Sequence, residues 1–168
     1  MVFRSGLLPF GRAAAVLAAV LALAACSSVP NAQQDASAFG AGGPGVPGSQ
    51  QDFVVNVGDR VFFEEDQSDL SGQARQTLDK QATWLRQYAR YPVTIEGHAD
   101  ERGTREYNLA LGARRAQSTR DYLIARGVDG ARIRTVSFGK ERPVAVCSDI
   151  SCWSQNRRAV TVLGGPAS

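Results

Sequence analysis

The sequence predicts an α+β domain over residues 52–168, in which a mixed β-sheet is covered on one face by two helices. Short strand-like runs alternate with two segments of helical periodicity, in the order strand, helix, strand, helix, strand, strand. Helices that separate strands in this way favour a mixed sheet with both helices on the same face. The chain of 168 residues is 43% hydrophobic and 21% charged, an ordinary globular composition that can form one core.

Four strands are predicted from β-branched and aromatic residues. The first is expected at 60–63, where the chain reads Arg-Val-Phe-Phe, and the second at 93–97, where apolar and polar residues alternate. The last two strands are expected at 132–138 and 159–163. These four runs supply the strands of a single sheet.

Two helices are predicted from apolar residues repeated every three or four positions. In the first helix these positions are Ala74, Leu78, Ala82, Leu85 and Ala89. In the second they are Leu109, Ala113, Ala116 and Leu123. Pro92 prevents the first helix from continuing, and Gly127 stands where a C-terminal cap of the second is expected.

Residues 1–25 have the layout of an export signal. Arg4 and Arg12 precede an apolar run that is too short to span a membrane and ends in small residues. The Leu-Ala-Ala-Cys run that ends at Cys26 resembles the lipobox of bacterial lipoproteins, in which the cysteine is acylated and becomes the mature N-terminus. Ser27, rather than Asp, follows the cysteine, which in lipoproteins implies delivery to the outer membrane. The alternative is an ordinary secreted protein with a cysteine after its signal.

Loss of the signal with its two arginines lowers the formal net charge from +3 to +1. A charge so near zero gives no reason to expect nucleic acid as a partner. Residues 26–51 are predicted to hold the acylated cysteine and a flexible tether. From 27 to 51 the chain is mainly Ala, Gly, Pro, Ser and Gln, with Asp35 as its only charge, so no core can offset the entropy of ordering it.

The densest polar segment, residues 96–108, begins at a strand end and runs into a helix, where functional loops commonly lie. Asn108 and Arg115 are seven residues apart and share a helix face with Leu111 between them. We expect Asp100 and Arg115 near the surface as a pair of opposite charges. Such a pair suits a ligand with its own amine and carboxylate. The alternative is that the two side chains only pair with each other or face solvent independently.

The sequence favours binding over catalysis, and no cofactor is expected. His98 is the only histidine, which excludes a His-rich metal site, and neither a P-loop nor a Gly-x-Ser-x-Gly or Gly-x-Gly-x-x-Gly motif occurs. His98, Asp100 and a serine could form a triad in principle, but the sequence has no nucleophile signature.

Two cysteines remain once Cys26 is assigned to the anchor. Cys147 and Cys152 enclose four residues, and in an exported protein this spacing predicts a disulfide that fixes the connection into the last strand. The alternative is a pair of buried free thiols.

Residues 93–139 and the run Asn156-Arg157-Arg158-Ala159-Val160 resemble the OmpA C-terminal-like family of peptidoglycan-binding domains. The run Gly-His-Ala-Asp-Glu-Arg-Gly-Thr at 97–104 is similar to the peptidoglycan-associated lipoproteins of that family, and so are the runs around Asn108 and Arg115. The resemblance implies the same strand–helix alternation with a mixed sheet. It also implies a lipid-anchored outer-membrane protein that faces the periplasm, binds the peptidoglycan stem peptide at diaminopimelate and supports envelope integrity and cell division. The implied protein partners are TolB and other proteins of the Tol system.

The resemblance also implies which residues contact peptidoglycan: Phe63, Glu64, Asp100, Asn108, Leu111 and Arg115. Asp100 and Arg115 correspond to the aspartate and arginine that bind the ligand, Asn108 to the asparagine that supports the loop, and Leu111 to a contact on the same helix face. Phe63 ends the first strand, and Glu64 stands where the family usually has Asp. The alternative function is that of another OmpA-like envelope lipoprotein that mainly docks proteins.

Overall fold

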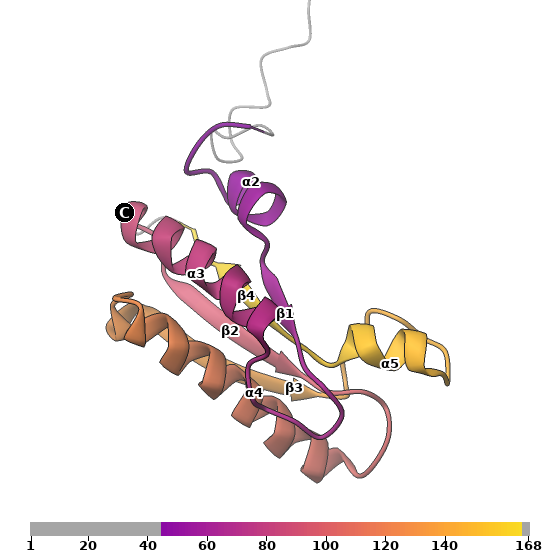
Figure 1. Ribbon diagram of the computed structural model, residues 1–168. Helices are drawn as coiled ribbons and strands as arrows, with labels where there is room; N and C mark the ends of the chain where they lie inside the picture. The colour runs from indigo at the N-terminus through magenta and orange to yellow at the C-terminus, as the bar shows by residue number, and fades with distance from the viewer. Residues whose placement is uncertain (1–44, 166–168) are drawn as a thin grey trace, which may run out of the picture. The chain divides into compact units, whose positions relative to one another are not determined.

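The computed structural model describes residues 45–165, and these residues contain one four-stranded sheet (Figure 1). The strands are β1 (Arg60–Phe62), β2 (Val93–His98), β3 (Ile133–Gly139) and β4 (Arg158–Leu163), and they lie side by side in the order β1-β4-β2-β3. Strand β2 is parallel to β3 and antiparallel to β4, which in turn is antiparallel to β1. The predicted mixed sheet is therefore confirmed.

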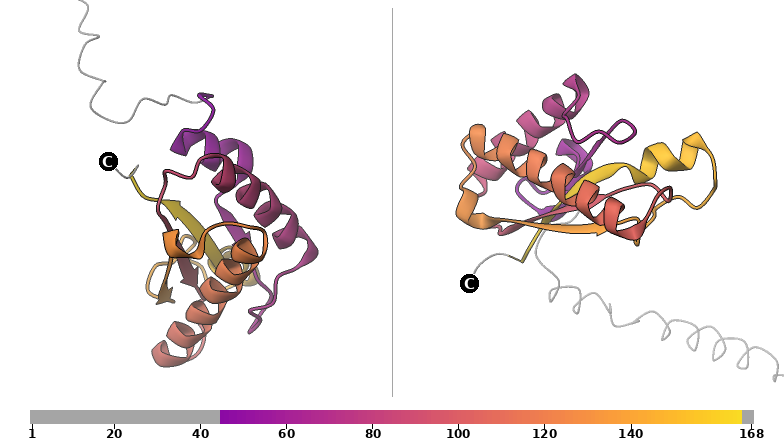
Figure 2. Two further views of the ribbon diagram at one scale, coloured as in Figure 1. Left: turned by 90° about the vertical axis from the view of Figure 1, so that its left-hand side faces the viewer. Right: turned by 90° about the horizontal axis from the view of Figure 1, so that it is seen from below.

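Both long helices, α3 (Gly72–Gln87) and α4 (Arg105–Ala125), lie on the same face of the sheet (Figure 2). Each begins at a polar cap: the side-chain oxygens of Ser71 and Thr104 each accept a backbone N–H from the first turn of α3 and α4. A short 3₁₀ turn, η4 (Gly130–Arg132), then leads from α4 towards β3. The two predicted helices and their common face are confirmed, except that α3 ends at Gln87 and leaves the predicted position Ala89 exposed in the turn that follows.

The face that α4 turns toward the sheet differs from the prediction. Leu109 is 41% exposed and Ala113 is also exposed, although both belong to the predicted apolar stripe. The buried residues of α4 are Asn108, Leu111, Gly112, Arg115, Ala116, Thr119 and Leu123. Three of these seven carry polar side chains: Asn108, Arg115 and Thr119. Apolar periodicity alone therefore misplaced the inner face of this helix.

Strand β2 and helix α4 approach each other at two glycines. A Cβ added to Gly97 would lie only 1.8 Å from the carbonyl oxygen of Gly112, so no larger residue fits at Gly97 without moving the helix. This contact fixes α4 against the end of β2. It also sets the path of the connecting loop, residues 99–104.

Residues just before the predicted boundary at 51/52 already take part in regular structure. Helix α2 (Gln50–Asp52) is capped by Ser49 and continues into a π-helical turn, η3 (Phe53–Val57). Phe53 is fully buried, with its ring 4.9 Å from the ring of Trp84. The last residues of the predicted tether therefore pack against the domain, with Phe53 in its core. The export signal, Cys26 and the rest of the tether lie outside the described residues.

One helix, α5 (Ile150–Asn156), was not predicted. It lies in the connection between β3 and β4 and stands to one side of the sheet (Figure 1). Cys147 and Cys152 are joined by a disulfide at its N-terminal end, with their Cα atoms 5.6 Å apart, which confirms the predicted bond. Within residues 45–165 no helix is both long and apolar enough to cross a membrane.

Candidate functional site

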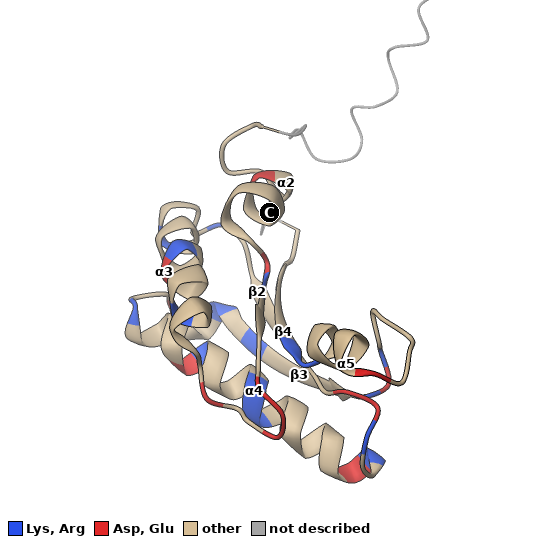
Figure 3. Ribbon diagram, turned by 45° about the vertical axis from the view of Figure 1, so that its right-hand side comes forward, with Lys and Arg blue, Asp and Glu red and all other residues tan. Residues whose placement is uncertain are grey.

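A pocket of about 170 Å³ lies where the loops after β1 and β2 meet α4. Acidic and basic positions come together at this end of the sheet (Figure 3). The lining residues are Glu65, Asp66, Asp100, Arg102, Gly103, Tyr107, Asn108, Leu111 and Arg115. Three carboxylates and two guanidinium groups therefore share one small concave surface.

Asp100 is held as a carboxylate by two arginines. Its Oδ2 lies 2.7 Å from Nη2 of Arg102 and 3.5 Å from Nη1 of Arg157, and its Oδ1 accepts the backbone N–H of Arg102 at 3.2 Å. Burial disfavours the charged form, but the hydrogen bonds and charge of Arg102, with a further contribution from Arg157, outweigh it. The pKa of the Asp100 carboxyl is consequently below its usual value.

Arg115 is fully buried within α4 and is held by main-chain carbonyls. Its Nε donates to Gln67 O at 2.8 Å, its Nη1 to His98 O at 2.9 Å and its Nη2 to Glu64 O at 3.0 Å. Burial, followed by the nearby charge of Arg157, lowers the pKa of Arg115 to about 10. The guanidinium therefore remains charged at neutral pH.

The expectation that Asp100 and Arg115 lie near the surface is wrong. Asp100 is 7% exposed and Arg115 is 0% exposed. The ion pairs of Asp100 are with Arg102 and Arg157, and none joins it to Arg115 within the described residues. The two groups nevertheless line the same pocket, so opposite charges are presented to one space without neutralising each other by direct contact.

Asn108 and Leu111 extend the same wall of the pocket from α4. The side-chain amide of Asn108 donates to Arg102 O at 2.6 Å and to Thr104 O at 3.1 Å, so it ties the loop after β2 to the start of the helix. Leu111 is 3% exposed and lies one turn further along. These positions agree with a loop-supporting amide and an apolar wall.

Phe63 and Glu64 do not line the pocket. The ring of Phe63 is buried beneath Arg115, with the guanidinium carbon 5.2 Å from the ring centre. Glu64 has an exposed side chain and contributes only its carbonyl oxygen to the binding of Arg115. Both residues therefore support the arginine from behind, and the structure does not bring either side chain into the cavity.

His98 also lies apart from the pocket. Its ring is 2% exposed and packs against Phe138, with ring centres 5.6 Å apart. Burial, followed by the charges of Arg158 and Arg142, lowers the pKa of His98 to about 4, so the imidazole is neutral at pH 7. No group of three or more His, Cys, Asp or Glu side chains within residues 45–165 is arranged to hold a metal ion.

Comparison with known proteins agrees with this geometry. Residues 62–157 match the model of the OmpA family, which covers more than half of the chain and includes the whole pocket. The chain belongs to the OmpA family. The matched segment begins in β1 and ends just before β4, so the loops that carry Asp100 and Arg102 lie within it.

Several relatives share the name peptidoglycan-associated lipoprotein. The protein of that name from Rhizobium meliloti (strain 1021) is 66% identical over 153 residues, covering 90% of this chain and 87% of the relative. That from Pseudomonas aeruginosa is 42% identical, covering 90% and 96%. The crystal structure of the Burkholderia pseudomallei protein of that name superimposes with a TM-score of 0.62 at 42% identity, covering 63% of this chain and 90% of that one. The C-terminal domain of Helicobacter pylori MotB, at 20% identity and a TM-score of 0.60, shares the fold.

Several polar residues at the pocket were not predicted from the sequence. Arg102 and Tyr107 line the pocket. Arg157, the residue just before β4, contacts Asp100, and its Nε donates to Phe63 O at 3.1 Å. Arg102 and Arg157 both stand within the runs that carry the family resemblance, but neither received a role. Arg102 lies only two residues after Asp100, so its opposite charge was a usable signal in the sequence. Arg157 is distant in sequence, and its contact with Asp100 can be recognised only when the order of the strands is known.

Proposed function

We propose that this chain is a non-enzymatic, lipid-anchored protein of the outer membrane that binds peptidoglycan non-covalently and tethers the membrane to the cell wall. The observation that carries this proposal is the pocket in which Asp100 and Arg115 present opposite charges without pairing with each other. The names of the relatives, which are 60–66% identical for the first three, support peptidoglycan as the partner.

The proposed ligand group is the diaminopimelate residue of the stem peptide, because it carries an ammonium and a carboxylate on one carbon. Arg115 uses one N–H of each nitrogen for a main-chain carbonyl, so each terminal nitrogen keeps one further N–H without a hydrogen bond within residues 45–165. A guanidinium is the side chain whose charge and N–H donors suit a carboxylate. Asp100, with Glu65 and Asp66 nearby, supplies negative charge for the ammonium.

The same arrangement favours binding over bond cleavage. A general base works best when its pKa is near the operating pH, whereas the pKa of Asp100 is held below its ordinary value by two guanidinium groups. His98, the only histidine of the chain, is buried away from the pocket. The proposal is thus a module that recognises the cell wall and leaves it intact.

The proposed anchor is acylated Cys26, which follows the export signal and precedes the tether. Several acyl chains, each contributing about 0.8 kcal/mol per buried methylene, make a stable membrane anchor. The domain would then face the periplasm, where TolB and the other Tol proteins are the proposed partners in envelope integrity and cell division. The lipoprotein names of the relatives support the anchor.

Sedimentation with peptidoglycan sacculi tests this function. We expect the mature lipoprotein, purified in detergent, to sediment with sacculi and to release no muropeptides. Release of muropeptides would instead indicate a wall-cleaving enzyme, and failure to sediment would favour the protein-docking alternative.

The anchor has a separate test. Cys26→Ser protein should fold but no longer partition with outer membranes after the cell wall has been digested. Wall digestion is necessary because peptidoglycan binding alone can retain the protein in the pellet. Membrane association of Cys26→Ser protein after digestion contradicts the proposed anchor.

A further inference from the structure

Arg102 connects the two loops that form the rim of the pocket. Its Nη2 lies 2.7 Å from Asp100 Oδ2, and its Nη1 lies 2.8 Å from Glu65 Oε1. The side chain is 35% exposed, so burial alone does not hold it in this orientation. Any group that fixes the guanidinium of Arg102 therefore also fixes the carboxylates on both sides of the pocket.

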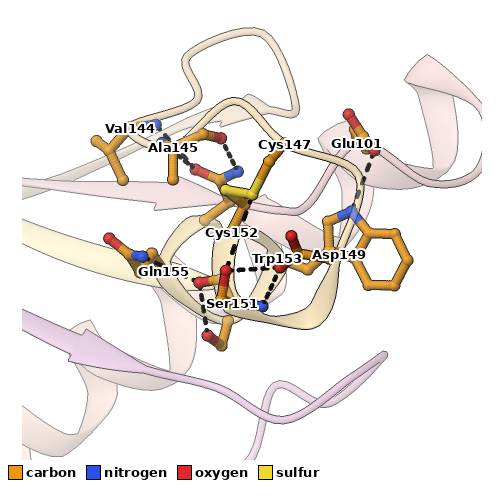
Figure 4. The surroundings of a disulfide bond; sticks show 11 residues. Glu101, Val144, Ala145, Cys147, Asp149, Ser151, Cys152, Trp153 and Gln155 are labelled. Atoms are coloured by element: carbon orange, nitrogen blue, oxygen red, sulfur yellow. Dashed lines mark hydrogen bonds between the residues drawn. A yellow bond between two sulfur atoms is a disulfide. The ribbon is translucent and has the colours of Figure 1, made fainter.

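Trp153 of α5 is such a group. The guanidinium carbon of Arg102 lies 4.2 Å from the centre of the Trp153 ring, within the range of a favourable cation–π contact. The indole Nε1 of the same side chain donates to Glu101 Oε1 at 3.1 Å (Figure 4). One side chain thus holds two consecutive residues of the loop after β2, although it does not line the pocket itself.

The position of Trp153 depends on a short, cross-linked segment. Helix α5 has seven residues, too few to be stable without help from its surroundings. The Cys147–Cys152 disulfide closes the chain immediately before Trp153. At the other end, Asn156 accepts the backbone N–H of Val144 at 2.8 Å and donates to Ala145 O at 2.8 Å.

We propose that the disulfide-closed segment 144–156 positions the peptidoglycan site, with Trp153 as the positioning residue that holds Arg102 against Asp100 and Glu65. This inference rests on the proposed function, because it assigns to α5 a part in binding the same ligand. A disulfide and a tryptophan outside the pocket then control how well the carboxylates of the pocket are aligned.

A double-mutant cycle on the detergent-purified, full-length mature protein tests this role. The probe is the soluble tripeptide L-Ala-γ-D-Glu-diaminopimelate, titrated by calorimetry. Trp153→Ala should weaken binding roughly 3- to 30-fold, the range expected for loss of a cation–π contact together with one hydrogen bond. Since Trp153 acts mainly through Arg102, the step from Arg102→Ala to Trp153→Ala/Arg102→Ala should cost clearly less affinity than Trp153→Ala costs in the wild type, with only the part due to the Glu101 hydrogen bond remaining.

Two control variants separate positioning from general damage to the fold. Trp153→Phe keeps a ring over Arg102 and should recover most of the affinity that Trp153→Ala loses. Val146→Ala removes an apolar side chain that is 87% exposed in the same segment, and it should bind like the wild type. If Trp153→Ala proves unfolded in a circular dichroism melt, the Trp153→Phe variant and the reduction experiment decide the question.

Reduction of the disulfide provides that second measurement. A dithiol donates two electrons and two protons, converting the Cys147–Cys152 bond into two thiols while it becomes a disulfide itself. Binding by the wild type should weaken on reduction, and the Cys147→Ser/Cys152→Ser protein should bind with the reduced affinity whether or not the dithiol is present.

The outcomes distinguish this inference from the proposed function. Failure of the oxidised wild type to bind the tripeptide contradicts both. Wild-type binding together with unchanged affinity in Trp153→Ala, or with losses that add in the double mutant, overturns the role of Trp153 alone. Unchanged binding after reduction and in the double-serine protein overturns the role of the disulfide.

Discussion

Arg115 and Asp100 line the same pocket, yet the fold holds them by different means. Arg115 lies on the sheet-facing side of α4 and is fully buried, with each nitrogen bound to a main-chain carbonyl of a neighbouring segment. Asp100 lies in a loop and is held by the side chains of Arg102 and Arg157. The cation is thus a part of the core, whereas the anion depends on ion pairs at the rim.

This difference predicts that the two charges contribute unequally to folding and binding. Three carbonyls on two chain segments, the loop after β1 and the end of β2, lose this buried donor if Arg115 is removed, and buried polar groups without partners are costly. If the Asp100 charge is removed, its two arginine partners keep other acceptors: Arg102 still pairs with Glu65, and Arg157 still donates to Phe63 O. Stability should therefore respond most to changes at Arg115, and selective loss of binding should follow changes at Asp100.

The largest effect is expected for Arg115→Ala. The free energy of unfolding should fall by about 3–5 kcal/mol, because the carbonyls of Glu64, Gln67 and His98 lose the same buried cation. Urea denaturation followed by circular dichroism measures this loss. Arg114→Ala is the matched control, since Arg114 is the exposed neighbour on the same helix and its loss should change stability by no more than about 0.5 kcal/mol. Equal stability of the two variants would show that Arg115 does not cross-link the core.

Asp100→Asn should separate binding from folding. The variant keeps the shape of the side chain but loses its charge, so affinity for the diaminopimelate tripeptide should fall by about 2–5 kcal/mol, or roughly 30- to 4,000-fold. The free energy of unfolding should fall by only about 1–2 kcal/mol. Calorimetric titration and urea denaturation on the same preparation test both halves.

Asp121→Asn is the control for Asp100→Asn. Asp121 is also an aspartate paired with an arginine, but it is 61% exposed and belongs to the part of α4 that does not line the pocket. Its replacement should leave affinity unchanged. Wild-type affinity in Asp100→Asn, or an equal loss in both variants, would contradict a specific role for the Asp100 charge.

His98 provides a pH-dependent contribution that is separate from the pocket. Its pKa of about 4 in the fold lies below the 6.5 of an ordinary histidine, so the unfolded chain takes up the proton first as the pH falls. The charges of Arg142 and Arg158 and burial oppose protonation in the fold, and Glu96, whose Oε2 is 3.6 Å from Nε2, does not outweigh them. The contribution of neutral His98 to the free energy of unfolding is therefore fully present above about pH 6.5, and it is lost progressively as the pH drops toward 4.

Urea denaturation from pH 7.5 to 4.5 measures this contribution. The wild type should lose roughly 2–3 kcal/mol over that interval from His98 alone, and His98→Leu should show a correspondingly flatter profile. Affinity for the tripeptide at pH 7.5 should be the same in both proteins, because His98 does not line the pocket. If the free energy of unfolding falls equally with pH in both proteins, the pH dependence does not come from His98.

The elements that apolar patterning predicted well are those whose buried face is apolar. The sheet and α3 follow this rule, with Leu78, Leu85 and Ile95 all fully buried. Helix α4 does not follow it, since Arg115 occupies the inner face while Leu109 is exposed. A buried arginine is stable there only because carbonyls from distant segments satisfy it, and those partners cannot be identified from local spacing.

The same reasoning explains which parts of the site were missed. Asp100 stood out because it follows a predicted strand in a dense polar run, but its partner Arg157 is the residue just before β4, a strand that pairs with β2 although it is far from it in sequence. Helix α5 is short and buries only Cys152 and Asn156, so it has no apolar stripe to detect. The cysteine spacing predicted its disulfide but gave no sign of the helix or of Trp153.

The smallest effect is expected at Glu64, the position where the chain departs from the aspartate usual in the family. Its side chain is exposed and outside the pocket, and only its carbonyl oxygen, 3.0 Å from Arg115 Nη2, takes part in the site. Every residue has that carbonyl, so Glu64→Asp should change the free energy of unfolding by less than about 0.5 kcal/mol. Tripeptide affinity should likewise change by less than about twofold, and calorimetric titration resolves such a difference. A clear gain in affinity would mean that the side chain at position 64 reaches the ligand. The residue would then contribute both its carbonyl oxygen to Arg115 and its side chain to binding, contrary to its exposed position outside the pocket.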